Sequence, residues 1–376
     1  MPPMRQNGGI MKKTLSFILA CAMTAMALTG CASQSTAVET TPAAETTTEA
    51  PTEAPTAESA AGETTIAPNT AAQAEAEGKA LVKVGSLKGP TSMGLVSLMD
   101  QAEKGESLNT YEFTMVAAAD ELLTKVVSGD LDIALVPANV ASVLYNKTKG
   151  NVTAIDINTL GVLYVVSGDD SIKSVADLKG KTVYMTGKGT TPDYVINYLL
   201  AENGLTKDDV KLEYKSEPTE VAALLKENSD AIGLLPQPFV TVAMAQNEDL
   251  KLVLDLTKEW EAVQGESGSQ LVTGVTIVRN DYLVDNKEAV DNFLKEHKTS
   301  ADFAVSNPDE TAELVAAQGI IEKAPIAKKA LPYCNITCIT GEDMKSAISG
   351  YLQVLFDQEP ASVGGTLPAD DFYYLP

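Results

Sequence analysis

Histidine is almost absent from this chain of 376 residues, which contains only His297. One imidazole cannot supply the histidine clusters that hold catalytic metals. Nor can a Ser-His-Asp or Cys-His set be built around it, because His297 stands between lysines in the helix-like stretch FLKEHKTSADF. We therefore expect His297 at the surface, and neither a metal site nor a cofactor.

Positive charge is also scarce, with 28 Lys and Arg against 51 Asp and Glu. No run of Lys or Arg is longer than a pair. Because binding to nucleic-acid phosphates needs clustered cations, nucleic acid is excluded as a partner.

A phosphate-binding loop of the G-x-x-x-x-G-K-[ST] type is missing as well. GSLKGPTS lacks the second Gly-Lys pair, and Gly180-Lys181-Thr182 comes before a strand rather than after one. The sequence therefore excludes a nucleoside triphosphatase of this type.

Cysteine occurs four times, and two of the four lie in the N-terminal region, at Cys21 and Cys31. The other two, Cys334 and Cys338, stand in PYCNITCIT. Their spacing needs a bend before a disulfide can form, so a disulfide and two buried thiols both remain open.

What the sequence does contain begins with an export signal. From Met11, MKKTLSFILACAMTAMALTGC has a basic start, an apolar stretch and then small residues. Its last four residues resemble the bacterial lipoprotein box, in which the cysteine, here Cys31, carries the lipid. We predict a lipoprotein signal peptide over 1–30, with the true start at Met1 or Met11, and a protein anchored by lipid to the extracytoplasmic face of the membrane.

A tract rich in Thr, Ala, Glu and Pro follows over 31–78. It has no aromatic residue and no apolar period, which predicts a disordered tether. No later stretch is long and apolar enough to span a bilayer.

Strand-like and helix-like segments then alternate over 80–270, which predicts an α/β fold with mostly parallel sheets flanked by helices. The plan occurs twice. KGPTS at 88–92 is echoed by KGTTP at 188–192, while Pro137 and Pro236 each close an apolar strand. We predict two lobes, one from 79–166 plus 276–376 and the other from 167–275, joined by crossing strands within 160–168 and 271–281.

Ligands of α/β sheets bind beyond the carboxyl ends of the strands, where four turns (88–93, 137–140, 187–192 and 236–239) are expected. Lys88 and Lys188 could clasp an anion or be solvated. Thr91, Ser92, Thr190 and Thr191 could donate to a ligand, cap helices or do both, and Asn139 and Gln237 could set specificity or be solvated loop residues. Phe239 and Trp260 could form a ligand wall or belong to the core. The candidate ligand-binding residues are Lys88, Gly89, Thr91, Ser92, Met93, Asn139, Lys188, Gly189, Thr190, Thr191, Gln237, Phe239 and Trp260.

Four stretches carry a family resemblance: SVADLKGKTVYMTGKGTTPDYVINYLLAENGL, SGDLDIALVPANVA, SDAIGLLPQPFVTVA and LPADDFYY. They resemble the type 2 periplasmic-binding-protein fold, in the family of nitrate, sulfonate, taurine and thiamin-precursor binding proteins of ABC importers. The resemblance implies a monomer that closes by a hinge over a small solute and delivers it to a membrane permease with its ATPase. It implies no enzymatic activity.

Two alternatives share this fold, an enzyme similar to the thiamin-pyrimidine synthase and a solute sensor. The shortage of histidine disfavours the enzyme. The ligand is either a small oxyanion or a heterocycle.

Overall fold

The computed structural model describes residues 64–65, 78–265 and 269–376. The predicted signal peptide, the lipidation site Cys31 and most of the predicted tether lie outside the described residues. Two tether residues are described as a short strand, β1 (Thr64–Thr65), which pairs with the edge of a sheet. No helix among the described residues has the length and apolarity needed to cross a membrane.

The first sheet has seven strands in the order β1-β3-β2-β4-β11-β5-β12. Strand β2 pairs in parallel with β3 and β4, whereas β11 runs antiparallel to both of its neighbours, β4 and β5. The strands are β2 (Leu81–Leu87), β3 (Thr110–Val116), β4 (Ile133–Pro137), β5 (Val152–Leu160), β11 (Val272–Arg279) and β12 (Ile336–Ile339).

The second sheet has five strands in the order β10-β6-β9-β7-β8. Its strands are β6 (Leu163–Ser167), β7 (Thr182–Met185), β8 (Lys211–Tyr214), β9 (Ile232–Pro236) and β10 (Lys251–Asp255). Again three parallel strands, β8, β7 and β9, are followed by one reversed strand, β6, and then by β10. The predicted α/β fold with one plan used twice is confirmed: in each sheet three parallel strands are followed by a reversed strand, β11 or β6. The first sheet also has an antiparallel pair at each edge, β1 with β3 and β12 with β5.

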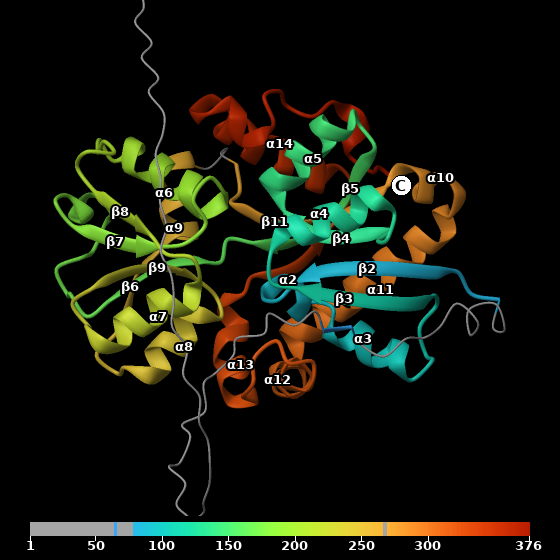
Figure 1. The fold of residues 1–376 in the computed structure, drawn as a ribbon, viewed down its shortest axis with the longest axis horizontal. Coiled ribbons are helices and arrows are strands. Elements are labelled where there is room, and N and C mark those ends of the chain that lie inside the picture. Colours follow the sequence, from blue (N-terminus) through green and yellow to red (C-terminus); the bar gives the residue numbers. More distant parts are fainter. Residues whose placement is uncertain (1–63, 66–77, 266–268) are drawn as a thin grey trace, which may run out of the picture. The chain divides into compact units, whose positions relative to one another are not determined.

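Helices surround each sheet (Figure 1). We call the seven-stranded sheet with α2–α5 and α10–α14 the first lobe, and the five-stranded sheet with α6–α9 the second lobe. The helices are α2 (Pro90–Met93), α3 (Val96–Glu103), α4 (Ala119–Ser128), α5 (Ala138–Thr148), α6 (Thr191–Glu202), α7 (Pro218–Glu227), α8 (Phe239–Gln246), α9 (Leu256–Gln264), α10 (Asn280–Asp285), α11 (Lys287–Ser306), α12 (Pro308–Ala317), α13 (Ala324–Ala330) and α14 (Gly341–Gln358).

The reversed strands mark where the chain passes between the sheets. Strand β5 ends in the first sheet at Leu160 and β6 begins in the second at Leu163, so only two residues separate them. The chain returns after α9 and enters the first sheet as β11. The predicted lobe boundary after residue 166 falls inside β6, and the one after residue 275 falls inside β11.

The only tryptophan lies in the core between the lobes. Trp260 is fully buried, and its ring centroid is 4.8 Å from that of Tyr198 on α6 and 5.6 Å from that of Tyr351 on α14. Its indole Nε1 donates a hydrogen bond to the carbonyl oxygen of Ser269 at 2.7 Å. Of the two roles considered for this aromatic side chain, the structure places it in the core, away from any ligand wall.

His297 is not at the surface, as the flanking lysines had suggested, but fully buried. It belongs to the stripe Phe293, His297, Ser300 and Ala304, which recurs every three to four residues along α11 and faces the sheet. Its Nδ1 lies 3.0 Å from Oδ2 of Asp156 on β5. Because the helical period and not the neighbouring charge sets burial, the surface prediction was wrong.

Both described cysteines are unpaired and buried, so of the two alternatives the structure has two buried thiols. Cys334 lies with its Sγ 3.6 Å from Sδ of Met93. Burial raises the pKa of both thiols well above the ordinary value.

Replacing Trp260 tests the junction between the lobes. Trp260→Ala should lower the free energy of unfolding by about 3–5 kcal/mol, because it leaves a large cavity between α6, α9 and α14. Trp260→Phe should cost about 1–2 kcal/mol, since it keeps most of the packing and loses the bond to Ser269. Urea unfolding followed by circular dichroism measures both; equal stabilities of the wild type and the alanine variant would contradict this packing role.

Candidate functional site

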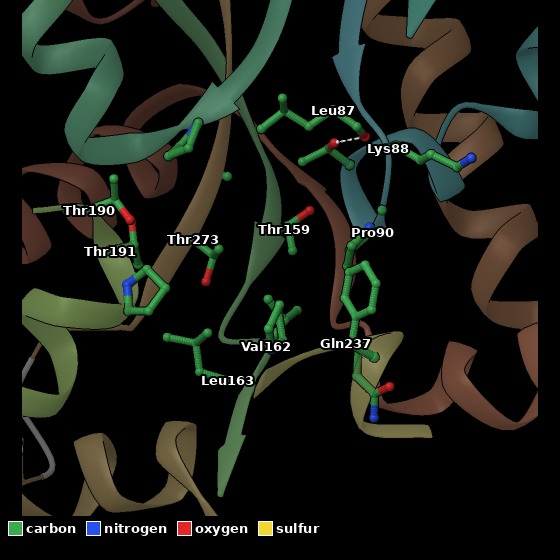
Figure 2. Close-up of a pocket in the computed structure, with 17 residues that line it drawn as sticks. Leu87, Lys88, Pro90, Thr159, Val162, Leu163, Thr190, Thr191, Gln237 and Thr273 are labelled. Carbon is green, nitrogen blue, oxygen red and sulfur yellow. Dashed lines mark hydrogen bonds between the residues drawn. The ribbon is translucent and has the colours of Figure 1, made fainter. Parts of the chain in front are cut away.

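The four predicted turns meet at one pocket of about 230 Å³ (Figure 2). The first lobe and the passage between the lobes supply Leu87, Lys88, Gly89, Pro90, Thr91, Pro137, Thr159, Val162, Thr273 and Gly274, and the second lobe supplies Leu163, Thr190, Thr191, Pro192, Pro236, Gln237 and Phe239. Because β2, β4, β7 and β9 all end here, the pocket lies at the carboxyl ends of parallel strands in both sheets.

Two threonine hydroxyls in this pocket are buried without a partner. Thr159, on β5, is 1% exposed, and Thr273 stands on β11. Neither Oγ1 makes a hydrogen bond to any described residue, and both side chains lie in the middle of Figure 2. An unpaired buried hydroxyl costs free energy, so these two atoms are ready to bond to a molecule in the pocket.

The other three threonine hydroxyls of the pocket are already used inside the protein. Thr91 donates to the carbonyl oxygen of Leu87 at 2.9 Å, and Thr190 donates to that of Gly187 at 2.7 Å. Thr191 donates to Oδ1 of Asn139 at 3.1 Å. Thr191 is the first residue of α6 and Thr190 occupies the cap position without a side-chain capping bond, so the capping expected of Thr191 is not found.

Gln237 lines the pocket with only 1% of its surface exposed. Its Oε1 accepts a hydrogen bond from the Thr241 hydroxyl at 2.9 Å, which fixes the side chain at the start of α8. Phe239, also predicted, lines the pocket as its aromatic wall.

Three further candidates in the turns are buried behind the pocket rather than lining it. Ser92 bonds to the hydroxyl of Ser86 and to the carbonyl oxygen of Leu87, each at 2.6 Å. Met93 is a fully buried core residue. Asn139 donates to the carbonyl oxygen of Ser362 at 3.3 Å and accepts from Thr191, so it supports the second lobe from the first.

The two lysines do not form a clasp. Lys188 is exposed outside the pocket, with its Nζ 5.5 Å from the centre of the Tyr214 ring. Lys88 lines the pocket, but its side chain points away from the other labelled residues (Figure 2). Gly189 also lies outside the pocket lining, and its N–H donates to Oδ2 of Asp193 at 2.8 Å.

That carboxylate changes the electrostatics of the second turn. Asp193 also accepts hydrogen bonds from the hydroxyl of Tyr214 and from the amide of Asn197, both at 2.6 Å. The protein therefore places its own negative charge at the N-terminus of α6, where a helix favours an anion. An anionic ligand would meet repulsion here.

Sequence reasoning missed the crossing-strand residues of the pocket. Thr159, Val162, Leu163, Thr273 and Gly274 belong to strand-like segments with no motif or spacing of their own. The prediction that these segments pass between the lobes was the one signal that could have found them. Pro137 and Pro236, by contrast, were noticed as matched strand ends.

A model of the family described as NMT1/THI5 like matches residues 126–311. A protein of Brucella abortus (strain 2308), provisionally named a binding protein, is 24% identical over 219 residues, which are 57% of this chain. The matched part spans 65% of that relative's length.

Solved structures show the same fold. An ABC transporter protein from Parabacteroides distasonis superposes with a TM-score of 0.66 at 23% identity, covering 78% of this chain and 98% of that one. The periplasmic aliphatic sulphonate binding protein SsuA from Escherichia coli gives 0.63 at 16% identity, covering 79% and 92%. Residues 126–311 thus belong to the NMT1/THI5-like family, on a chain that has the fold of the periplasmic binding proteins.

Proposed function

We propose that this protein is the substrate-binding component of an ABC importer, which captures a small molecule in the pocket between its lobes and delivers it to a membrane permease. The observation that carries the proposal is the pair of buried, unpartnered hydroxyls of Thr159 and Thr273, which face a pocket lined by both lobes. Family membership and fold support it.

Closure around the ligand follows from where the lining residues stand. A molecule that bonds to Thr159 on the first sheet and packs against Gln237 and Phe239 of the second lobe contacts both lobes at once. It therefore binds the closed arrangement more tightly than an open one and shifts the population toward it. The predicted lipid anchor at Cys31 and the tether would hold such a protein near its permease on the extracytoplasmic side.

Of the two ligand classes, the lining favours a heterocycle over an oxyanion such as sulfonate, nitrate or taurine. Proline, leucine, valine, phenylalanine and threonine make up most of the wall, and among the described residues that line it Lys88 is the only charged one. A buried anion needs compensating charge or several donors. A flat, uncharged ring with one or two polar groups would match the apolar walls and the two free hydroxyls.

The same lining disfavours the alternative of an enzyme. No His, Cys, Asp or Glu is among the described residues that line the pocket. General acid–base or nucleophilic chemistry normally uses these side chains. A binding role needs none of them.

Identification of the bound molecule tests the proposal. The purified protein is denatured, and the small molecules released are identified by mass spectrometry; a thermal-shift panel of pyrimidines, sulfonates and nitrate follows. We expect a ring compound to be released in a stoichiometric amount and pyrimidines to raise the melting temperature. Turnover of that compound would contradict a pure binding role.

Removing the two free hydroxyls should weaken binding of the identified compound. Thr159→Val and Thr273→Val keep the side-chain shape and should each lower affinity about 5- to 20-fold, the loss of one hydrogen bond of about 1–1.8 kcal/mol. Thr110→Val is the matched control, because Thr110 is also a buried strand residue with an unpartnered hydroxyl but does not line the pocket. Isothermal titration calorimetry measures all three, and equal losses in the control would refute the contact.

Neutralising the lysines separates the ligand classes. Lys88→Ala and Lys188→Ala should each change affinity by less than about twofold, because neither ammonium group points into the pocket. Titration calorimetry at low and at physiological salt gives the comparison. A loss of tenfold or more in either variant would restore the anion clasp and overturn the preference for an uncharged ring.

A further inference from the structure

A cluster of metal-ligand side chains lies in the first lobe, outside the pocket lining. Asp156 on β5, His297 on α11 and Cys338 on β12 are all buried, and one potential ligand atom from each lies within 4.8 Å of the other two. The residues come from distant parts of the sequence, since Asp156 and His297 have a sequence separation of 141.

The hydrogen bonds of the cluster leave it incomplete. Asp156 accepts from the hydroxyl of Thr276 at 2.7 Å through Oδ1, and its Oδ2 lies 3.0 Å from Nδ1 of His297. The other ring nitrogen, Nε2, is buried and has no partner among the described residues. Either tautomer therefore leaves a buried polar group of the imidazole unpaired, which is costly in a protein interior.

Charge is unbalanced as well. Asp156 is fully buried, and the only ion pair that the described residues offer it is with His297, which is charged only when protonated. A divalent cation would balance the charge of this buried carboxylate.

We propose that Asp156, His297 and Cys338 bind one divalent cation of the zinc type. Carboxylate oxygen, imidazole nitrogen and thiolate sulfur are the ligands that zinc takes, at about 2.0–2.3 Å. Ligand atoms in such a tetrahedral site are about 3.3–3.8 Å apart, and the three ligand atoms of this cluster already lie within 4.8 Å of one another. One carboxylate, one thiolate and a neutral imidazole make the buried complex electrically neutral.

The site would act as a structural clamp. It joins β5, β12 and α11, and β5 carries Thr159 of the pocket three residues after Asp156. Thr276, which bonds to Asp156, stands on β11 three residues after Thr273. A bound cation would therefore fix both strands that present the free hydroxyls.

Cobalt(II) substitution tests the proposal on the full chain. The protein is unfolded with chelator, refolded with Co²⁺ and desalted, because a buried site fills most readily during folding. We expect one cobalt per chain, a near-ultraviolet thiolate-to-cobalt charge-transfer band and the visible bands of tetrahedral cobalt. Zinc should displace the cobalt and abolish these bands.

Cys338→Ala should weaken cobalt binding at least about tenfold and remove the charge-transfer band. Cys334→Ala is the matched control, since Cys334 is buried four residues away and outside the cluster, and it should bind as the wild type does. Failure of the refolded wild type to retain cobalt, or identical binding and spectra in the two alanine variants, would overturn the proposal. The wild-type spectrum decides even if a variant does not fold.

Discussion

The chain passes twice between the two sheets, and these two passages determine where the pocket forms. In each sheet three parallel strands are followed by a strand that runs against them: β6 in the second lobe and β11 in the first. The ends of β2, β4 and β9, the turn after β7 and residues of both passages line one pocket. The positions of the other lining residues depend on this arrangement of strands and passages.

The sequence predicted the fold well because the repeat reflects backbone geometry. Gly89, Gly187 and Gly189, in the echoed turns, all have positive φ angles, which other residues rarely adopt. Because few residues tolerate such φ angles, these positions favour glycine, and the glycines can be recognised in the sequence of the two turns. Pro137 and Pro236 also reflect a backbone constraint, because proline has a fixed φ and no N–H, and each stands at the end of a strand.

The side chains at the site were harder to predict, because their roles depend on partners far away in the chain. Lys88 and Lys188 repeat in the sequence, but one points away from the pocket and the other lies against Tyr214. Thr159 and Thr273 have no local signal, since only their position on the passages between lobes makes them important. His297 looked exposed beside its lysines, although its helical face is buried. In each case the position of the side chain in the tertiary structure, and not its neighbours in the sequence, determines its role.

The hydroxyl of Thr191 on α6 bonds to Asn139 on α5, and that of Tyr164 on β6 bonds to the backbone of Tyr333 at 2.8 Å, so polar contacts join the lobes without help from a bound molecule. Such contacts raise the fraction of empty protein that is already closed. The apparent dissociation constant equals the intrinsic constant divided by the fraction in the binding-competent form. In the proposed role, the bond between Asn139 and Thr191 would set a trade-off: a stronger bond between the lobes would tighten ligand binding and, by the same factor, make the liganded and empty protein harder for a permease to distinguish.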